Sequence, residues 1–296
     1  MRRGDATVYR RPARLLDLHG RPTASRLSCA MVRAGLPVDA GSAWGGAAVR
    51  WLAGWWRIVH LGALLAVLAL SPTSYRADLH AKLARHLWLG TGPTVVWFTV
   101  ASALAGLVLI RIVVVTAVSY GLTQYALEMV VRVLVLELIP LAAALFVALR
   151  YTLPQAAVLA QRRLRDVQLP ALPDAATLRR DLLPRLLAGV FGVLTLAAAS
   201  GVVALVIAYL MVYGFTPWGL PAYTRTVGHV FTPAVVLIFA FKTLFFSLTV
   251  SLIPIASAVY DAPGAGTLVV AELRALVRMF VLLLVIEAIS LMGNYY

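Results

Sequence analysis

Charged side chains stand inside or at the edges of long apolar runs of this chain, where lipid would otherwise surround them. They are Arg111, Glu137, Lys242, Arg274 and Glu287. A carboxylate in hydrocarbon costs about 2.5 kcal/mol or more on insertion scales, so such groups usually face a protein interior or a wet cavity. Two roles follow from the residue types: these groups fix helix packing by snorkelling or pairing, or they line a substrate path.

The run at 133–150 combines a carboxylate, Glu137, with a helix-breaking proline, Pro140. Proline lacks an N–H group, so it frees a backbone carbonyl that a neighbour must satisfy. A plain lipid anchor needs neither feature, and we therefore expect this helix to pack inside a polytopic assembly. Glu137 could form a buried pair with Arg111 or with Lys242, and such pairs are seldom kept for stability alone.

The elements that position these groups follow from composition. Of the 296 residues, 61% are hydrophobic and only 13% are charged, and the mean hydropathy is +0.89. This balance predicts an all-α integral membrane protein. Apolar stretches of roughly 20 residues predict five spans, at about 93–118, 128–150, 186–213, 233–258 and 268–290.

Several chemistries are excluded by what the sequence lacks. The single cysteine, Cys29, cannot form an internal disulfide, and no Cys/His cluster indicates a metal. There is no catalytic or nucleotide-binding motif, so we expect neither an enzyme nor a resident cofactor, and any ATP must be bound by a separate subunit. The net charge of +14 lies mainly outside the spans and fits topology and lipid contact rather than nucleic-acid binding.

The arginines predict the orientation. The connection between the second and third predicted spans holds Arg162, Arg163, Arg165, Arg179, Arg180 and Arg185. The connection before it, at 119–125, has no Lys or Arg, and the connection after it, at 214–232, has one arginine, Arg225. The positive-inside rule makes the loop at 151–185 cytoplasmic. Five spans then place the N-terminus in the cytoplasm and the C-terminus outside.

The N-terminal part divides in two. Residues 1–45 are basic and rich in Gly and Pro, and we expect disorder there. Residues 46–92 read as an interfacial helix followed by an amphipathic connector, since Trp51, Trp55 and Trp56 suit headgroup depth. A sixth crossing at 51–70 is the alternative, but it conflicts with the basic N-terminus.

The cytoplasmic loop contains a predicted short helix. Val158, Leu159, Arg162 and Arg163 recur at helical spacing before a Leu/Pro break. This helix is a candidate for coupling to an ATPase, and the alternative is a solvated loop that only sets topology. The third predicted span is dense in Gly, Ala and Ser, which allows close helix approach either within the chain or between two copies.

From about Trp51 to the C-terminus, the order and spacing of several segments resemble the MlaE-type permease family. Residues 136–150 resemble its RELGPVxxALLxAGR signature. Further similar segments are 180–185 (R-x-L-x-x-P-R, one residue shorter here), 242–246 (I-K-S-x-x-F), 260–266 (Y-D-A…AG) and 274–277 (within ATTRAVV). Glu287 stands where the family has an aspartate. The residues assigned to packing or to the family motifs are Pro140, Arg150, Arg185, Asp261, Arg274 and Glu287.

The sequence also departs from the family pattern. Leu136 replaces the signature arginine, and Ile139 and Leu149 replace two glycines. Residues 158–164 read VLAQRRL where the family has an ELGTM…TEQ segment. The resemblance implies that the family's ELGTM…TEQ segment contacts the ATPase. Two explanations of its replacement therefore stand: this chain binds a divergent ATPase, or it pairs with a more typical permease copy.

The resemblance implies an interfacial helix and five transmembrane helices, in agreement with the charge-based topology. It further implies a permease subunit of an ABC lipid transporter in the bacterial inner membrane, forming a homodimer or a pair with a paralogous permease. Its partners would be an ATPase subunit and a periplasmic MCE-domain protein. Arg111, Glu137 and Lys242 would then be candidates for lipid contacts in the cavity.

Two other functions are weighed against this one. A non-transporting scaffold of an MCE assembly would explain the departure at 158–164. A secondary transporter of ions or small solutes would show inverted repeats and broken helices, and no convincing repeat is found.

Overall fold

Helices account for every regular element that the structure describes, as the apolar runs predict. The computed structural model describes residues 40–71, 77–165, 175–260 and 268–295. Asp261 and most of the predicted disordered region at 1–45 therefore lie outside the described residues. Residues 40–45, which are described, already belong to the first helix.

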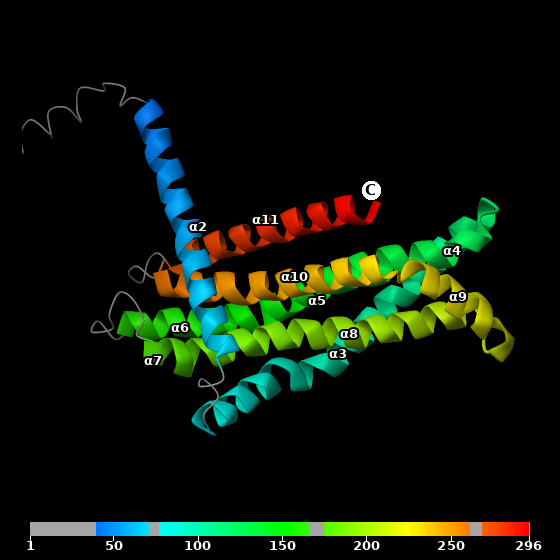
Figure 1. Ribbon diagram of the computed structural model, residues 1–296, viewed down its shortest axis with the longest axis horizontal. Helices are drawn as coiled ribbons and strands as arrows, with labels where there is room; N and C mark the ends of the chain where they lie inside the picture. The colour runs from blue at the N-terminus through cyan, green and yellow to red at the C-terminus, as the bar shows by residue number, and fades with distance from the viewer. Residues whose placement is uncertain (1–39, 72–76, 166–174, 261–267, 296) are drawn as a thin grey trace, which may run out of the picture. The chain divides into compact units, whose positions relative to one another are not determined.

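The helices follow one another with short connections (Figure 1). The first half comprises α2 (Ala40–Leu70), α3 (Ala77–Ser119), α4 (Thr123–Val130), η2 (Val131–Leu138), α5 (Ile139–Val147), η3 (Ala148–Thr152) and α6 (Leu153–Arg165). The second half comprises α7 (Ala175–Thr177), η4 (Leu178–Leu182), α8 (Leu183–Tyr213), η5 (Pro217–Gly219), α9 (Leu220–Val230), α10 (Pro233–Tyr260) and α11 (Leu268–Tyr295).

The expected membrane class is confirmed. Among the described residues, six helical stretches are long and apolar enough to cross a bilayer: Leu52–Leu70, Thr94–Ser119, Tyr125–Arg163, Leu178–Tyr213, Pro233–Tyr260 and Val270–Gly293. Large apolar side chains on these stretches are exposed, among them Trp97, Leu104, Val202 and Leu284. Apolar surface on this scale is normal only where lipid or another protein covers it.

The predicted loop at 151–185 is more helical than expected. Helix continues without interruption from Thr123 to Arg165 and starts again at Ala175. The predicted short arginine-rich helix is confirmed as α6, which extends the preceding span instead of standing apart from it. The connector before the first span likewise forms one continuous helix with that span, α3.

The chain divides into two units, 1–53 and 54–296, and the first contains only the start of α2 among the described residues. Within the second unit, the part of α2 from Gly54 onward packs on α10 and α11: a Cβ at Gly62 would meet Leu252, and one at Gly54 would meet Arg278. This part crosses those helices at a steep angle (Figure 1). Such an angle suits a helix lying in the interface, although length alone also permits a crossing, and the interfacial placement stays a prediction.

Three prolines explain three wide turns in the helices. The π-helical segments η2, η3 and η4 each end two residues before a proline, namely Pro140, Pro154 and Pro184. A proline cannot donate to the carbonyl four residues earlier, and its ring clashes with that carbonyl. A π-helical turn opens the ladder at this point. The span predicted at 128–150 is thus one continuous helix through Pro140, because the helix widens there instead of ending.

The centre of the bundle is α8, which contacts α3, α5 and α10. Figure 1 shows α5, α8 and α10 running alongside one another. The small residues of α8 are mostly buried inside the chain, including Ala188, Ala197, Ser200 and Ala204. Of the two possibilities for these residues, packing within the chain is the one that the structure shows. Small side chains let the helix backbones approach closely, which favours helix association in a membrane, where the hydrophobic effect does not drive it.

The closest approach is at Gly189, which gives a test of this packing. A Cβ there would lie 2.4 Å from the Ser251 Oγ and 3.1 Å from the Thr152 Cγ2. Overpacking should therefore make Gly189→Ala less stable, by about 1 kcal/mol or more, than a Gly→Ala change at an uncrowded position of the same helix. The measurement is thermal unfolding of the full chain in detergent.

Gly201→Ala, on the same helix, is the matched control. Its Cβ would sit 3.8 Å from the Val135 Cγ1, an ordinary contact. Alanine is favoured over glycine in a helix by about 1 kcal/mol, so Gly201→Ala should leave stability unchanged or raise it. Equal losses for the two variants would contradict the close contact of α8 with α10.

Candidate functional site

Three charged side chains from three helices meet inside the bundle. The Lys242 Nζ of α10 donates to the Glu137 Oε2 of η2 and lies 2.8 Å from the Glu287 Oε2 of α11. Lys242 is 3% exposed and Glu137 is 8% exposed. We call Glu137, Lys242 and Glu287 the charged triad.

Pro140 contributes a fourth partner. Since proline has no N–H, the carbonyl of Leu136, four residues earlier, receives no α-helical hydrogen bond from it. The Lys242 Nζ lies 3.4 Å from this carbonyl oxygen and donates to it. The expectation that a neighbour must satisfy the freed carbonyl is met, and the neighbour is the same lysine that pairs with Glu137.

The surroundings of the triad are apolar. The Lys242 Nζ lies 5.7 Å from the centre of the Phe246 ring, within the range of a cation–π contact. Leu136 and Ile139 are buried next to Glu137 along the chain. Charges in such a place interact strongly because water screens them little.

The charges of the triad do not balance. Two carboxylates face one ammonium, so full ionisation leaves one negative charge in excess. A bound proton, or a cationic group of a ligand, would remove that excess. The arrangement can therefore hold a polar or charged group inside an otherwise apolar bundle, and it provides no nucleophile–base pair for catalysis.

Arg111 does not join this cluster. It lies exposed on α3, while the neighbouring Ile110 is fully buried in the core. Of the two pairings considered for Glu137, the structure shows the one with Lys242. Arg111 is eight residues from the end of its span at Ser119, about 12 Å along the helix axis, so its long side chain can reach toward the interface.

The remaining motif residues fall into different environments. Pro140 and Arg185 are buried, whereas Arg150 and Arg274 are exposed. Glu287, which the sequence assigned to packing or to a family motif, is the third member of the triad. Two features of the sequence point to Glu287. Its carboxylate lies a few residues from the outer end of an apolar run, and the resembling family motif has an acid at this position.

The four candidate coupling residues divide by exposure along α6. Val158 is 41% exposed and Arg162 is also exposed. Leu159 is half-buried and packs against the core, and the Arg163 Nη1 donates to the backbone oxygen of Val259. Only Val158 and Arg162 therefore remain accessible to another protein, while Leu159 and Arg163 attach α6 to the bundle.

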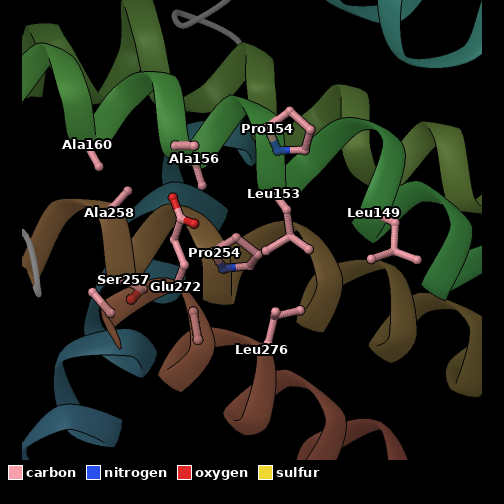
Figure 2. A pocket seen from close by; sticks show the side chains of 13 residues that line it. Leu149, Leu153, Pro154, Ala156, Ala160, Pro254, Ser257, Ala258, Glu272 and Leu276 are labelled. Carbon is pink, nitrogen blue, oxygen red and sulfur yellow. The ribbon is translucent and has the colours of Figure 1, made fainter. Parts of the chain in front are cut away.

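An apolar pocket of about 260 Å³ lies between α6, α10 and α11 (Figure 2). Its walls include Leu153, Ala156, Pro254 and Leu276, and Glu272 extends a carboxylate across it toward α6 (Figure 2). The α11 residue of the pocket nearest to Glu287 is Leu276, which lies 11 residues earlier, or about 17 Å along the helix axis. The pocket is thus separate from the triad, and it suits an apolar group.

Among the described residues, no group of His, Cys, Asp and Glu side chains is placed to hold a metal ion.

Removing the ammonium tests what the triad contributes. Lys242→Met leaves two buried carboxylates without their cation, and breaking a buried pair in this way costs about 3–5 kcal/mol. We expect a large drop in the thermal unfolding temperature of the full chain in detergent. The triple variant E137Q/K242M/E287Q, which carries no buried charge, should recover most of the loss. A Lys242→Met protein as stable as the wild type would show that the triad is not held together as described.

Comparison with known proteins identifies the family of the chain. A comparison with individually curated proteins gave no significant match. The sequence model of the family described as Permease MlaE matches residues 83–292, which cover α3 from near its start through most of α11. All members of the charged triad lie within the match. The chain therefore belongs to the MlaE permease family.

Proposed function

We propose that this chain is the membrane permease subunit of an ABC transporter that moves phospholipid or a similar lipid between the inner membrane and the periplasm. The observation that carries the proposal is the charged triad, buried in an apolar bundle of a permease-family protein. Acyl chains need an apolar route, and a headgroup needs a few polar contacts along it. Glu137 and Lys242 are the proposed headgroup contacts, joined by Glu287.

The partners follow from the same proposal. ATP is hydrolysed on a separate ATPase subunit, and an MCE-domain protein receives or delivers lipid on the periplasmic side. Two permease copies, identical or paralogous, enclose the lipid cavity. Exposed Arg111 would face that cavity or the second copy.

The orientation is supported by both ends of the helices. Arginines gather where α6 ends and α8 begins, and this end is proposed to be cytoplasmic. The turn after α8 carries Phe215 and Trp218, which are 92% and 90% exposed. Aromatic side chains are typical of membrane interfaces, and this turn is proposed to lie on the periplasmic side with the C-terminus.

A non-transporting scaffold of an MCE assembly is the second candidate. The observation that favours it is the absence of the family's ELGTM…TEQ segment from α6. A stable complex with an ATPase distinguishes the two functions, because a scaffold has no need of one.

Lipid transfer tests the role of the triad. The purified permease is reconstituted with its ATPase and MCE partners in liposomes, and ATP-dependent transfer of fluorescent phospholipid is measured. E137Q/K242M/E287Q should transfer lipid at least about tenfold more slowly, a loss of about 1.4 kcal/mol or more in the barrier. Arg225→Gln, an exposed cation on α9, is the control and should keep wild-type transfer. If the neutral triple variant and Arg111→Gln both transfer lipid normally, the headgroup role is wrong.

ATPase binding tests the role of α6. Val158→Asp and Arg162→Glu change its two accessible candidates without disturbing Leu159 or Arg163. We expect each to reduce co-purification of the ATPase about fivefold or more, since interface cores exclude charge and opposite charges guide docking. Arg225→Glu, at the other end of the bundle, should have no effect. Unchanged binding for both α6 variants would place the ATPase contact elsewhere, and a wild type without an ATPase partner would favour the scaffold.

A further inference from the structure

A second concentration of charge lies at the end of the bundle that is proposed to be cytoplasmic. The start of α3, α6, and the junction of η4 with α8 enclose a cavity of about 380 Å³. We call this cavity the basic pocket. Its lining residues are Lys82, Arg85, His86, Gln155, Val158, Arg162, Arg180, Asp181 and Arg185.

The charges in the basic pocket are strongly unbalanced. Five cationic side chains line it, and Asp181 is the one carboxylate among the lining residues. That carboxylate lies 3.8 Å from the Lys82 Nζ, and both side chains are about half exposed. This pair cancels one of the five positive charges. Among the described lining residues, the arginines of α3, α6, η4 and α8 therefore remain in excess.

Arg185 is the deepest of these cations. It is only 6% exposed. Its Nη1 donates to the backbone oxygen of Gln155 at 3.5 Å, whereas its Nε finds no hydrogen-bond partner among the residues that the structure describes. A buried cation with an unused donor is costly unless an anion accepts from it. Arg185 is therefore a mostly buried cation in the wall of the pocket, and no carboxylate is paired with it among the residues that the structure describes.

We propose that the basic pocket binds a phosphate group. Guanidinium groups present planar forks of N–H donors that match phosphate oxygens in pairs, and Arg85, Arg162, Arg180 and Arg185 supply such forks from three elements. A cavity of this volume holds a phosphate and the small group attached to it. The phosphate comes either from an anionic lipid headgroup, which suits a basic pocket beside membrane helices, or from a small soluble phosphate compound.

An acidic segment of a partner protein is a less favourable occupant. Its carboxylate would have to reach the buried Arg185 at the bottom of a cavity built by three elements. The accessible cations at the rim, such as Arg162, would satisfy such a segment without use of Arg185. The test below separates these occupants.

His86 reports on occupation of the pocket. Burial lowers the pKa of His86, and the nearby Arg185 and Arg85 lower it further, while Lys82 adds a little and Asp181 opposes them. The Tyr151 hydroxyl lies 3.3 Å from its Nδ1. An anion bound among these cations cancels part of their repulsion, so the pKa of His86 should rise when phosphate binds. Nitrogen NMR of histidine-labelled protein measures this shift, with His86→Gln to assign the signal.

The experiment uses the full chain in detergent, without ATPase, and two probes. Native mass spectrometry counts retained phosphatidylglycerol against phosphatidylcholine, and thermal unfolding measures stabilisation by inorganic pyrophosphate. The variant is Arg85→Gln/Arg180→Gln, which leaves the buried Arg185 in place so that the fold is kept. Arg165→Gln, an exposed cation of α6 outside the pocket, is the matched control.

We expect the double variant to lose at least about fivefold in binding of one probe, while the control keeps wild-type binding. Loss of phosphatidylglycerol retention alone identifies a lipid source, and loss of pyrophosphate stabilisation alone identifies a soluble one. The proposal is overturned if the wild type retains no more phosphatidylglycerol than phosphatidylcholine and gains no stability from pyrophosphate. It is also overturned if the double variant binds both probes as the wild type does, or if the control loses as much binding as the double variant. The proposed lipid transport fails separately, through the triad variants.

Discussion

The ammonium of Lys242 has to be neutralised inside an apolar bundle, and this requirement fixes three helices relative to one another. Glu137 on η2 and Glu287 on α11 reach the same nitrogen from two sides. A shift of either helix by one residue would rotate its carboxylate by about 100° away from α10. Because an unpaired charge at this depth is so costly, the pairing selects one register out of the many that apolar packing alone would tolerate. The small residues of α8 then allow the bundle to close in that register.

Proline placement makes this geometry possible. A π-helical turn before Pro140 moves the residues of η2 around the helix axis relative to α5, and it leaves the Leu136 carbonyl to accept from Lys242. The same device recurs before Pro154 and Pro184, where the spans meet the arginine-rich end of the bundle. Each proline thus redirects the side chains that precede it without ending the helix. Proline-linked π-helical turns therefore orient charged side chains both at the triad and at the arginine-rich end of the bundle.

Much of this fold could be predicted from the sequence, because lipid imposes simple rules. The five predicted spans all fall within long apolar helices, and the sixth such helix, α2, was expected to lie in the interface. Glu137 was expected to face inward and to pair with Lys242 or with Arg111. The sequence could not say which charges meet, because that depends on the rotation of each helix. Arg111 and Glu287 are both single charged residues within apolar spans. Arg111 is nevertheless exposed, whereas Glu287 completes the triad. The π-helical turn before Pro140 was not predicted, because such a turn leaves no periodic signature of its own in the sequence.

The basic pocket was hidden for a different reason. Its arginines are counted by the positive-inside rule as a set of topology signals, and the rule is indifferent to where each side chain points. Only the folded chain shows that Arg85 and Arg185, a hundred residues apart, converge on one cavity. The two charged centres have opposite sign: the triad carries a carboxylate in excess, and the basic pocket carries several cations in excess. A phosphate attracted to the pocket would therefore be repelled by the triad's excess charge unless a proton or a cationic group accompanied it. Under the proposed function, a headgroup carrying both charges would be accepted by the triad more readily than a purely anionic one.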